Sequence, residues 1–201
     1  MTSFLPQKDV PLAPLTTLRV GGMAEYFASI DDEDQLLQAC RWAKEQKQRI
    51  TILAGGSNVL IADSGLAGLV LQINIKGREY RHNSSGSVMA TFQAGEILDE
   101  VVSETVTRGL WGLENLSGIP GSVGATPIQN VGAYGVEVSD IIYSLRVLDT
   151  ESLKISNWLA SECEFAYRDS VFKKHKKGQT KKKKKKKTPK KKKKKPGQPN
   201  K

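Results

Sequence analysis

Short stretches rich in apolar, β-branched and aromatic residues recur along the chain between polar and glycine-containing segments, a pattern that predicts short strands. The stretches with this character are 25–29, 50–53, 59–61, 69–73, 88–94, 141–148 and 153–155. The last two are predicted to pair as a hairpin around Asp149–Glu151, and a turn at 84–87 is predicted to lead into 88–94. Residues 1–16 are rich in proline and have no periodicity, so they are predicted to form an irregular lead-in.

Two other stretches repeat their apolar residues at the spacing of a helix. The first begins with the acidic residues 31–34, where the helix dipole favours negative charge, and ends near Lys44 and Lys47. Its predicted buried stripe is Leu36, Leu37, Cys40 and Ala43. The second spans 96–108 and is stopped by Gly109. Its predicted inward residues are Leu98, Val101, Val102, Thr105 and Val106.

Ser161 and Glu164 have the spacing of a capping box for a third, short helix. The strands and helices are therefore short and interleaved. This order favours an α+β fold of two layers over a doubly wound parallel sheet.

Charge is distributed very unevenly along the chain. The net charge is +10, yet residues 1–172 hold all 21 acidic side chains and fewer than half of the 31 basic ones. Residues 173–201 are rich in lysine and contain no apolar residue, so this low-complexity tail is predicted to be disordered. A polylysine segment binds polyanions through charge alone, whereas a solvated extension without function is the simpler interpretation. Because the tail has no aromatic side chain to stack on bases, no specific nucleic-acid partner is expected.

Other functional classes are disfavoured by what the sequence lacks. Cys40 and Cys163 are too few for a disulfide framework. The start of the chain does not have the pattern of a signal peptide, and no apolar run approaches the about 18–20 residues of a membrane span. A cytoplasmic monomer without a metal site or a membrane partner is therefore expected.

Residues 116–135 contain five glycines and are the most distinctive part of the chain. Glycine permits positive φ and lets a ligand or another backbone segment come close. Apolar residues stand between these glycines, so the stretch is predicted to be buried. Two interpretations are open: a tight crossing of two core segments, or a wall that binds a polar, planar or phosphorylated ligand.

A second glycine-rich loop, residues 54–58, follows a predicted strand and reads Ala-Gly-Gly-Ser-Asn. Successive N–H groups in such a loop can form an anion-binding concavity, and Ser57 and Asn58 add further donors. The loop matches neither the Walker motif nor the Gly-x-Gly-x-x-Gly fingerprint. An ordinary β-turn is therefore an open alternative.

Six motifs, taken together and in this order, resemble those of UDP-N-acetylenolpyruvoylglucosamine reductases, bacterial enzymes of peptidoglycan precursor synthesis. The motifs are residues 17–22, 54–60, 112–116, 119–125, 127–135 and 167–172. The resemblance covers residues 17–172 and implies an FAD-binding fold of the vanillyl-alcohol-oxidase (PCMH) type, with two small α+β subdomains at about 17–75 and 76–172. It also implies FAD as cofactor, NADPH as hydride donor and UDP-N-acetylenolpyruvoylglucosamine as substrate.

The resemblance further implies that the two glycine-rich loops are halves of one FAD site, the first holding the pyrophosphate and the second lining the flavin. The residues expected from the first loop are Ala54, Gly55, Gly56, Ser57, Asn58, Val59 and Leu60. Those expected from the second are Ile119, Gly121, Ser122, Val123, Gly124, Ala125, Gln129, Asn130, Gly132 and Tyr134. At Gly56 and Gly124 a side chain is expected to obstruct the ligand more than it disturbs the fold.

Arg168 is the one catalytic residue that the resemblance implies, as the cation that stabilises the carboxylate and enolate of the substrate. From the residues alone, a surface ion pair with Asp169 is the alternative. The family pattern breaks at about Lys174, and no serine or glutamate before it can be assigned by motif to protonate the substrate. The simplest explanation is a truncated or frame-shifted chain.

Three functions therefore stay open. The first is the FAD-dependent reductase that the resemblance implies. The second is a flavin-binding fragment without turnover, and turnover is not expected of this chain alone. The third is a polyanion-binding protein that acts through the lysine tail.

Overall fold

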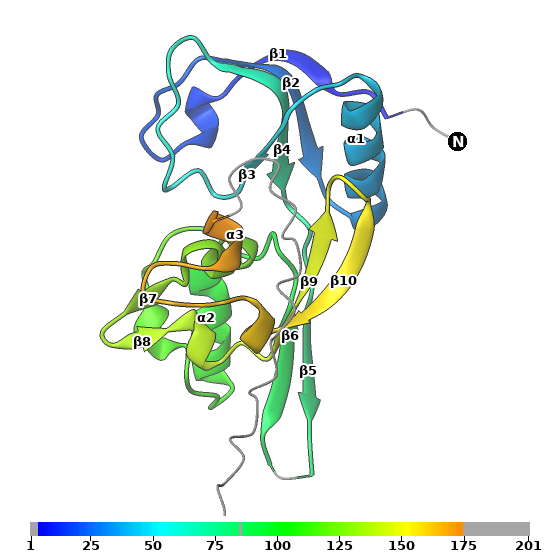
Figure 1. Cartoon of the computed structure of the whole chain (residues 1–201). Helices are drawn as coiled ribbons and strands as arrows, with labels where there is room; N and C mark the ends of the chain where they lie inside the picture. Colours follow the sequence, from blue (N-terminus) through cyan, green and yellow to red (C-terminus); the bar gives the residue numbers. More distant parts are fainter. Residues whose placement is uncertain (1–3, 85, 175–201) are drawn as a thin grey trace, which may run out of the picture.

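The computed structural model describes residues 4–84 and 86–174, which form two lobes (Figure 1). The first lobe is a four-stranded sheet with the strand order β1-β2-β4-β3. Its elements are β1 (Gln7–Pro11), β2 (Met23–Ile30), α1 (Glu33–Glu45), β3 (Ile50–Leu53) and β4 (Leu66–Ile73). β1 runs antiparallel to β2, whereas β2 and β3 both run parallel to β4.

The predicted irregular lead-in is wrong at β1. Gln7–Pro11 pairs along β2, with Gln7 opposite Phe27 and Pro11 opposite Met23. This pairing satisfies the backbone of a segment that has no periodicity of its own. The prolines lie at or beyond the end of the edge strand, where no ladder hydrogen bond is interrupted.

Strand β4 is the centre of the first lobe, because both of its faces are covered. Leu69 and Leu71 are fully buried in a cluster with Cys40 of α1, whereas Val70 joins Phe27 in a cluster on the opposite side of the sheet. Successive side chains of a strand point to opposite faces, which explains this division.

Helix α1 begins where the acidic stretch predicts it. The carboxylate of Asp32 caps the helix by accepting a hydrogen bond from the N–H of Gln35 at 2.7 Å. Cys40 and Ala43 are buried against the sheet, as predicted. The helix thereby returns the chain to the sheet, so that β3 adds beside β4 and the loop after β3 emerges at one edge of the lobe.

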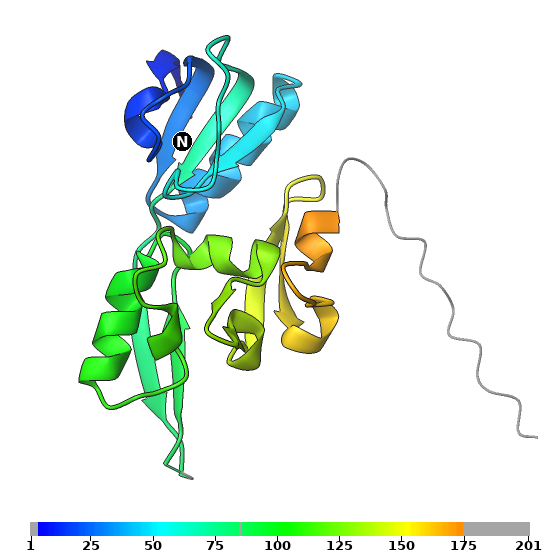
Figure 2. The same ribbon diagram turned by 90° about the vertical axis from the view of Figure 1, so that its left-hand side faces the viewer.

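The second lobe is built from two-stranded hairpins, helices and 3-10 turns. Its strands are β5 (Arg78–His82), β6 (Val88–Phe92), β7 (Gly132–Ala133), β8 (Val136–Glu137), β9 (Ser144–Asp149) and β10 (Lys154–Leu159). Its helices are α2 (Leu98–Thr107) and α3 (Val171–Lys174), and its longest 3-10 segment is η3 (Val123–Gln129). Figure 2 shows the β5–β6 hairpin with α2 on one side of this lobe and the β9–β10 hairpin with α3 on the other.

Hairpin β9–β10 connects the lobes by reaching back to α1 (Figure 1). Arg146 on β9 forms an ion pair with Glu33 at 2.8 Å. Leu148 and Leu153 pack against the cluster beneath α1. The second lobe is thus attached to the first by apolar packing as well as by the chain itself.

Arg78 joins the β5–β6 hairpin to the segment that carries α2. Its guanidinium lies within 2.8 Å of carboxylate oxygens of Glu96, Glu100 and Glu104. Burial alone would raise the pKa of Glu96, but hydrogen bonds from the Gly77 N–H and from Arg78 hold that pKa below its ordinary value. The hydrogen bond from Arg78 likewise lowers the pKa of Glu104.

Three local predictions are wrong. Residues 59–61 form no strand, because only Ile61 turns into the core and Leu60 is 79 % exposed. Val106 lies on the solvent side of α2 and is 52 % exposed. The third helix is a single 3-10 turn, Ala160–Glu162, and Glu162 rather than Glu164 accepts the capping hydrogen bond, from the Leu159 N–H.

The predicted boundary of the lysine tail is also too early. Lys173 and Lys174 belong to α3, and both make hydrogen bonds or ion pairs with the folded body. The rest of the tail lies outside the described residues. Among the residues that the structure describes, no helix is long and apolar enough to cross a membrane.

Candidate functional site

A cavity of about 600 Å³ lies between the two lobes. Its walls come from the end of β3 and the following loop, from the start of α2, from the glycine-rich stretch, and from residues near α3. The volume is within the range of about 300–1,000 Å³ that is typical of ligand pockets. The cavity therefore joins the two loops that the sequence picks out.

Most of the predicted site residues line this cavity. They are Ala54, Gly55, Gly56, Ser57, Asn58, Val59, Ile119, Gly121, Ser122, Ala125, Gln129, Gly132 and Arg168. Those that do not line it are Leu60, Val123, Gly124, Asn130 and Tyr134. The lining residues that the sequence reasoning missed are Ile52, Leu98, Pro120, Thr126, Ile128, Val131, Ala133 and Lys173.

The loop after β3 presents a run of free backbone donors. The N–H groups of residues 55–58 donate to no acceptor within 4–84 and 86–174. Gly56 has φ +66° and its carbonyl accepts from the Thr17 N–H, which fixes the path of the loop from the other side. Neighbouring free N–H groups of this kind suit an anion such as a diphosphate.

The two glycine-rich loops touch each other at one end of the cavity. The Ser57 hydroxyl donates a hydrogen bond to the Pro120 carbonyl at 3.4 Å. A Cβ atom on Gly55 would lie 3.2 Å from the Cα of Gly121. The absence of side chains at these two glycines is thus what lets the lobes approach.

The prediction that a side chain at Gly56 or Gly124 would mainly obstruct a ligand is wrong. A Cβ on Gly56 would lie 2.1 Å from the Leu15 carbonyl oxygen, and a Cβ on Gly124 would lie 2.7 Å from the Cβ of Ala94. The Gly124 N–H also donates to the Ala94 carbonyl at 2.9 Å. Both glycines are required by the crossing of backbone segments, so a side chain at either position disturbs the fold first.

The predicted residues outside the cavity have other contacts. Asn130 is 1 % exposed, and its side-chain amide donates to Glu137 at 2.6 Å and to the Ala166 carbonyl at 3.2 Å. The Val123 N–H donates to the Glu96 carbonyl. Leu60 and Tyr134 are 79 % and 88 % exposed. Asn130 therefore serves this region by tying the glycine-rich stretch to the turn before Arg168.

Arg168 lies on a tight turn in which Ala166 and Asp169 exchange backbone hydrogen bonds, each of 3.0 Å. Its backbone is left-handed, with φ +51°, and its guanidinium donates to the Gly132 carbonyl at 2.9 Å. Asp169 forms its ion pair with Lys174 at 3.0 Å, and this contact lowers the pKa of Asp169. Arg168 therefore does not form the surface ion pair with Asp169 that was the alternative interpretation, and it lines the cavity instead.

Apart from Arg168 and Lys173, the described residues that line the cavity are small, apolar or neutral. Ile52, Val59, Leu98, Ile119, Ile128 and Val131 supply the apolar walls. Such walls suit a flat apolar ring system, while the free amides of residues 55–58 suit a diphosphate. The residues present therefore fit FAD, which combines both features.

Comparison with known proteins agrees with this geometry. The family model described as "FAD binding domain" matches residues 24–152. The chain is 46 % identical over 168 residues to the UDP-N-acetylenolpyruvoylglucosamine reductase of Saccharopolyspora erythraea, an alignment that covers 84 % of this chain and 46 % of that protein. It is 41 % identical to the reductase of the same name from Neisseria meningitidis, with coverage of 84 % and 48 %. The chain thus spans about half the length of these curated relatives.

Solved structures of related proteins have the same fold. The UDP-N-acetylenolpyruvylglucosamine reductase of Thermus caldophilus superposes with a TM-score of 0.64 and 27 % identity, covering 83 % of this chain and 57 % of that one. A flavoprotein of the vanillyl-alcohol-oxidase type from Myceliophthora thermophila shares the fold, with a TM-score of 0.52 at 13 % identity, covering 67 % of this chain and 26 % of that one. The predicted resemblance and fold class are confirmed. This chain belongs to the FAD-binding domain family, and its relatives are UDP-N-acetylenolpyruvoylglucosamine reductases.

Proposed function

We propose that this chain binds FAD in the cavity between the lobes and serves as the flavin-carrying part of a UDP-N-acetylenolpyruvoylglucosamine reductase that uses NADPH. One observation carries the proposal: four successive free N–H groups lie at one wall of a cavity whose other walls are apolar and basic. FAD supplies the hydride-transfer chemistry of such a reaction, and the protein supplies binding, orientation and charge. A cytoplasmic location and a monomeric state are further parts of the proposal.

The chain's own residues have distinct roles in this scheme. The N–H groups of residues 55–58 bind the diphosphate. The hydrogen bond from Ser57 to the Pro120 carbonyl keeps the two loops together around the ligand. Apolar side chains from both lobes, among them Ile52 and Ile128, exclude water from the ring.

Arg168 is the proposed catalytic cation. A guanidinium stays charged at all working pH values and offers a planar set of donors, which suits a carboxylate and the negative charge that develops beside it. The Gly132 carbonyl accepts one of these donors and thereby fixes the orientation of the group. The remaining donors are free to bind an anionic substrate.

A second candidate is a flavin-binding unit that has no turnover by itself. The observation in its favour is that, among the described residues, no Asp, Glu, His or Cys side chain lines the cavity, so these residues offer no ordinary acid to protonate the substrate carbon. General acid catalysis is typically worth about 10²–10⁴ in rate. Under this candidate, FAD binds but the reaction needs groups from outside these residues.

The test is NADPH oxidation that depends on UDP-N-acetylenolpyruvoylglucosamine, measured on the full 201-residue chain with added FAD. We expect FAD binding without substrate-dependent turnover for this chain alone. Turnover that Arg168→Met abolishes and Arg146→Met leaves unchanged would instead show that the complete acid–base machinery lies within this chain. Absence of FAD binding would contradict both candidates.

A further inference from the structure

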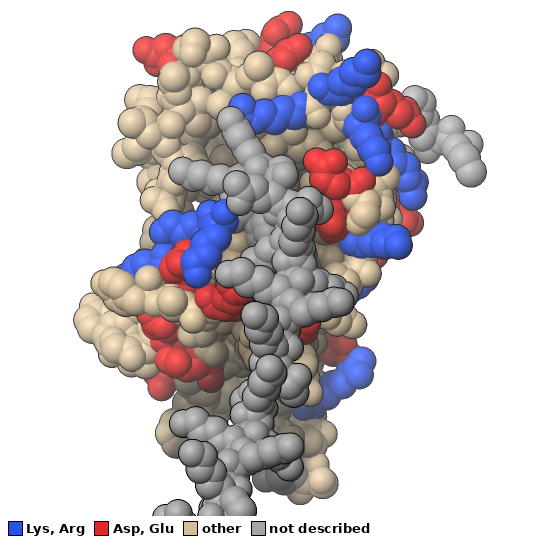
Figure 3. Space-filling view, viewed as in Figure 1, with Lys and Arg blue, Asp and Glu red and all other residues tan. Residues whose placement is uncertain are grey.

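The cavity has the opposite charge from the body that surrounds it. Residues 1–172 hold all 21 acidic side chains and fewer than half of the basic ones. Yet among the described residues, the charged ones that line the cavity are Arg168 and Lys173, and no acidic residue of this part of the chain lines it. On the face shown in Figure 3, basic side chains lie beside acidic ones at the level where the two lobes meet, and others are spread over the first lobe. A cavity with only positive charges in an acidic body favours an anionic ligand.

Lys173 is held beside Arg168 by a specific contact. Its ammonium group donates a hydrogen bond to the Arg168 carbonyl at 2.8 Å. An ammonium group has three hydrogens, so two donors are left for a ligand. Within residues 4–84 and 86–174 the Lys173 ammonium forms no ion pair that would neutralise it.

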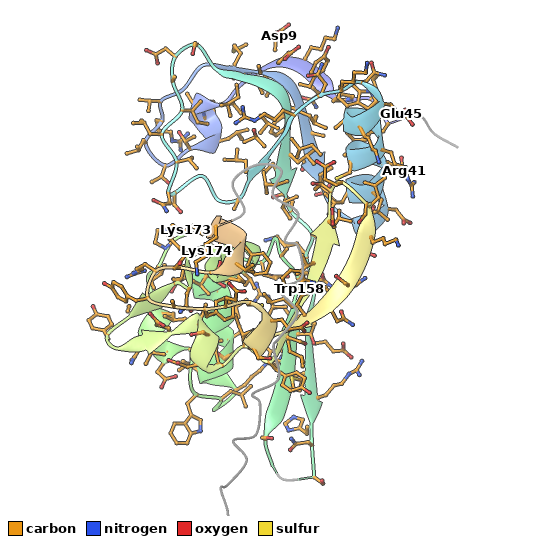
Figure 4. All side chains as sticks on the ribbon, viewed as in Figure 1. Asp9, Arg41, Glu45, Trp158, Lys173 and Lys174 are labelled. Atoms are coloured by element: carbon orange, nitrogen blue, oxygen red, sulfur yellow. The ribbon has the colours of Figure 1, made fainter. Side chains whose placement is uncertain are left out.

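Lys174, the next residue along α3, is placed differently. It forms an ion pair with Asp169 at 3.0 Å and does not line the cavity. Figure 4 shows both lysines on α3, at the level between the lobes. The two neighbouring lysines therefore have different surroundings: Lys173 lines the cavity, whereas Lys174 pairs with a carboxylate of the protein.

We propose that Lys173 is an anion-binding residue of this site: its ammonium group binds a diphosphate group, while the neighbouring Arg168 adds positive charge to the same part of the cavity. This inference rests on the proposed function, because the diphosphate belongs either to FAD or to a nucleotide-sugar substrate. A diphosphate carries two adjacent negative charges, which two neighbouring cations bind better than one. The inference makes Lys173 part of the site and not part of a polylysine tail.

The test compares Lys173→Met, Lys173→Arg and Lys174→Met with the wild type, all in the full chain. Dissociation constants are measured for FAD, for riboflavin, which has no phosphate, and for UDP. Thermal unfolding without ligand checks that the variants are equally folded. We expect Lys173→Met to weaken the binding of at least one diphosphate ligand about tenfold, the size expected when a charged hydrogen bond is lost. Lys173→Arg retains most of the affinity, and Lys174→Met retains all of it.

The ligands distinguish the two sources of the diphosphate. Weaker binding of FAD with unchanged riboflavin assigns Lys173 to the cofactor, and weaker binding of UDP alone assigns it to the substrate. If the wild type binds UDP but no flavin, the proposed function fails, while loss of UDP binding in Lys173→Met still supports the inference. Equal affinities in Lys173→Met and Lys174→Met for both diphosphates would overturn it, as would a wild type that binds neither.

Discussion

At the scale of single residues, some glycines near the cavity are needed for packing within the fold and others for the approach of the two loops. A pair of alanine substitutions can distinguish the two kinds. Gly55 and Gly124 both have ordinary backbone angles, so alanine is compatible with each backbone. At Gly124 the added methyl would overlap Ala94, and overpacking of this kind costs about 1–3 kcal/mol. We expect Gly124→Ala to lower the melting temperature of the chain without ligand.

Gly55→Ala is the matched variant with the opposite expected result. The three atoms nearest to its methyl would all belong to the backbone of Gly121, the closest at 3.2 Å, between the two loops that line the cavity. We expect it to weaken FAD binding several-fold while the melting temperature falls by less than in Gly124→Ala. A larger loss of stability in Gly55→Ala, as measured by thermal unfolding without FAD, would contradict this assignment.

These glycines also mark how far the sequence could predict the site. Their clustering indicates that some group approaches the backbone closely, but it does not show whether that group is a ligand or another segment of the chain. Gly124 is approached by Ala94, which lies in another segment, and no local pattern encodes that contact. Lys173 was missed for a related reason: in the sequence it is the first residue of a lysine run, and its hydrogen bond to Arg168 and its place in the cavity wall are visible only in the structure.

At the scale of elements, the contact of Arg78 with the α2 segment predicts a dependence of stability on pH. Folding lowers the pKa of Glu96 and Glu104 below the ordinary 4.5, so both carboxylates stabilise the fold above that pH. Their contribution is lost as the pH falls through the lowered folded-state values. We expect the free energy of unfolding, measured with urea, to decrease from about pH 5 to about pH 3.

Arg78→Met should flatten this decrease and destabilise the chain at neutral pH. Glu96 is only 4 % exposed, and leaving such a carboxylate without its cation costs about 3–5 kcal/mol. Arg81→Met is the control, because Arg81 pairs with Glu79 at the surface. An acid transition with the same slope in wild type and Arg78→Met would show that other carboxylates control it.

The β9–β10 hairpin gives a second prediction at this scale, because it packs the second lobe against α1. Truncating Leu148 to alanine removes apolar contact with the cluster beneath α1 and should cost about 2 kcal/mol. Arg146→Met, which breaks only the exposed ion pair with Glu33, should cost less than about 1 kcal/mol. Urea unfolding of both variants is the measurement. Equal losses of unfolding free energy in the two variants would mean that the ion pair stabilises the hairpin as much as Leu148 does.

Helices could be predicted from the sequence of this chain more reliably than strands. Helix α1 follows from residues close together in the sequence, and its extent and the burial of Cys40 and Ala43 were predicted, whereas its cap, Asp32, was not. Strand β1 was missed because its regular structure comes from pairing with β2 rather than from its own pattern. Residues 59–61 show the reverse case: they are apolar like a strand but pair with no strand among the described residues.

At the scale of the whole molecule, the two lobes and the contacts between them create the site. Neither loop forms a cavity alone, since one wall comes from the end of β3 and the others from the second lobe. The resemblance of six motifs predicted that these loops belong together, but composition and periodicity did not. The ligand should therefore stabilise the assembled molecule: FAD at about 100 times its dissociation constant should add about 2.7 kcal/mol to the free energy of unfolding.

The most direct test of the central claim is a titration of the full-length, flavin-free chain with FAD, followed by visible absorption and equilibrium dialysis. We predict saturable binding of one FAD per chain, with a perturbed flavin spectrum. Gly55→Ala should weaken this binding, whereas Arg81→Met, far from the cavity lining, should not. If thermal unfolding shows that the chain is folded, yet it binds no FAD at any concentration, the assignment of the cavity as the FAD site is contradicted.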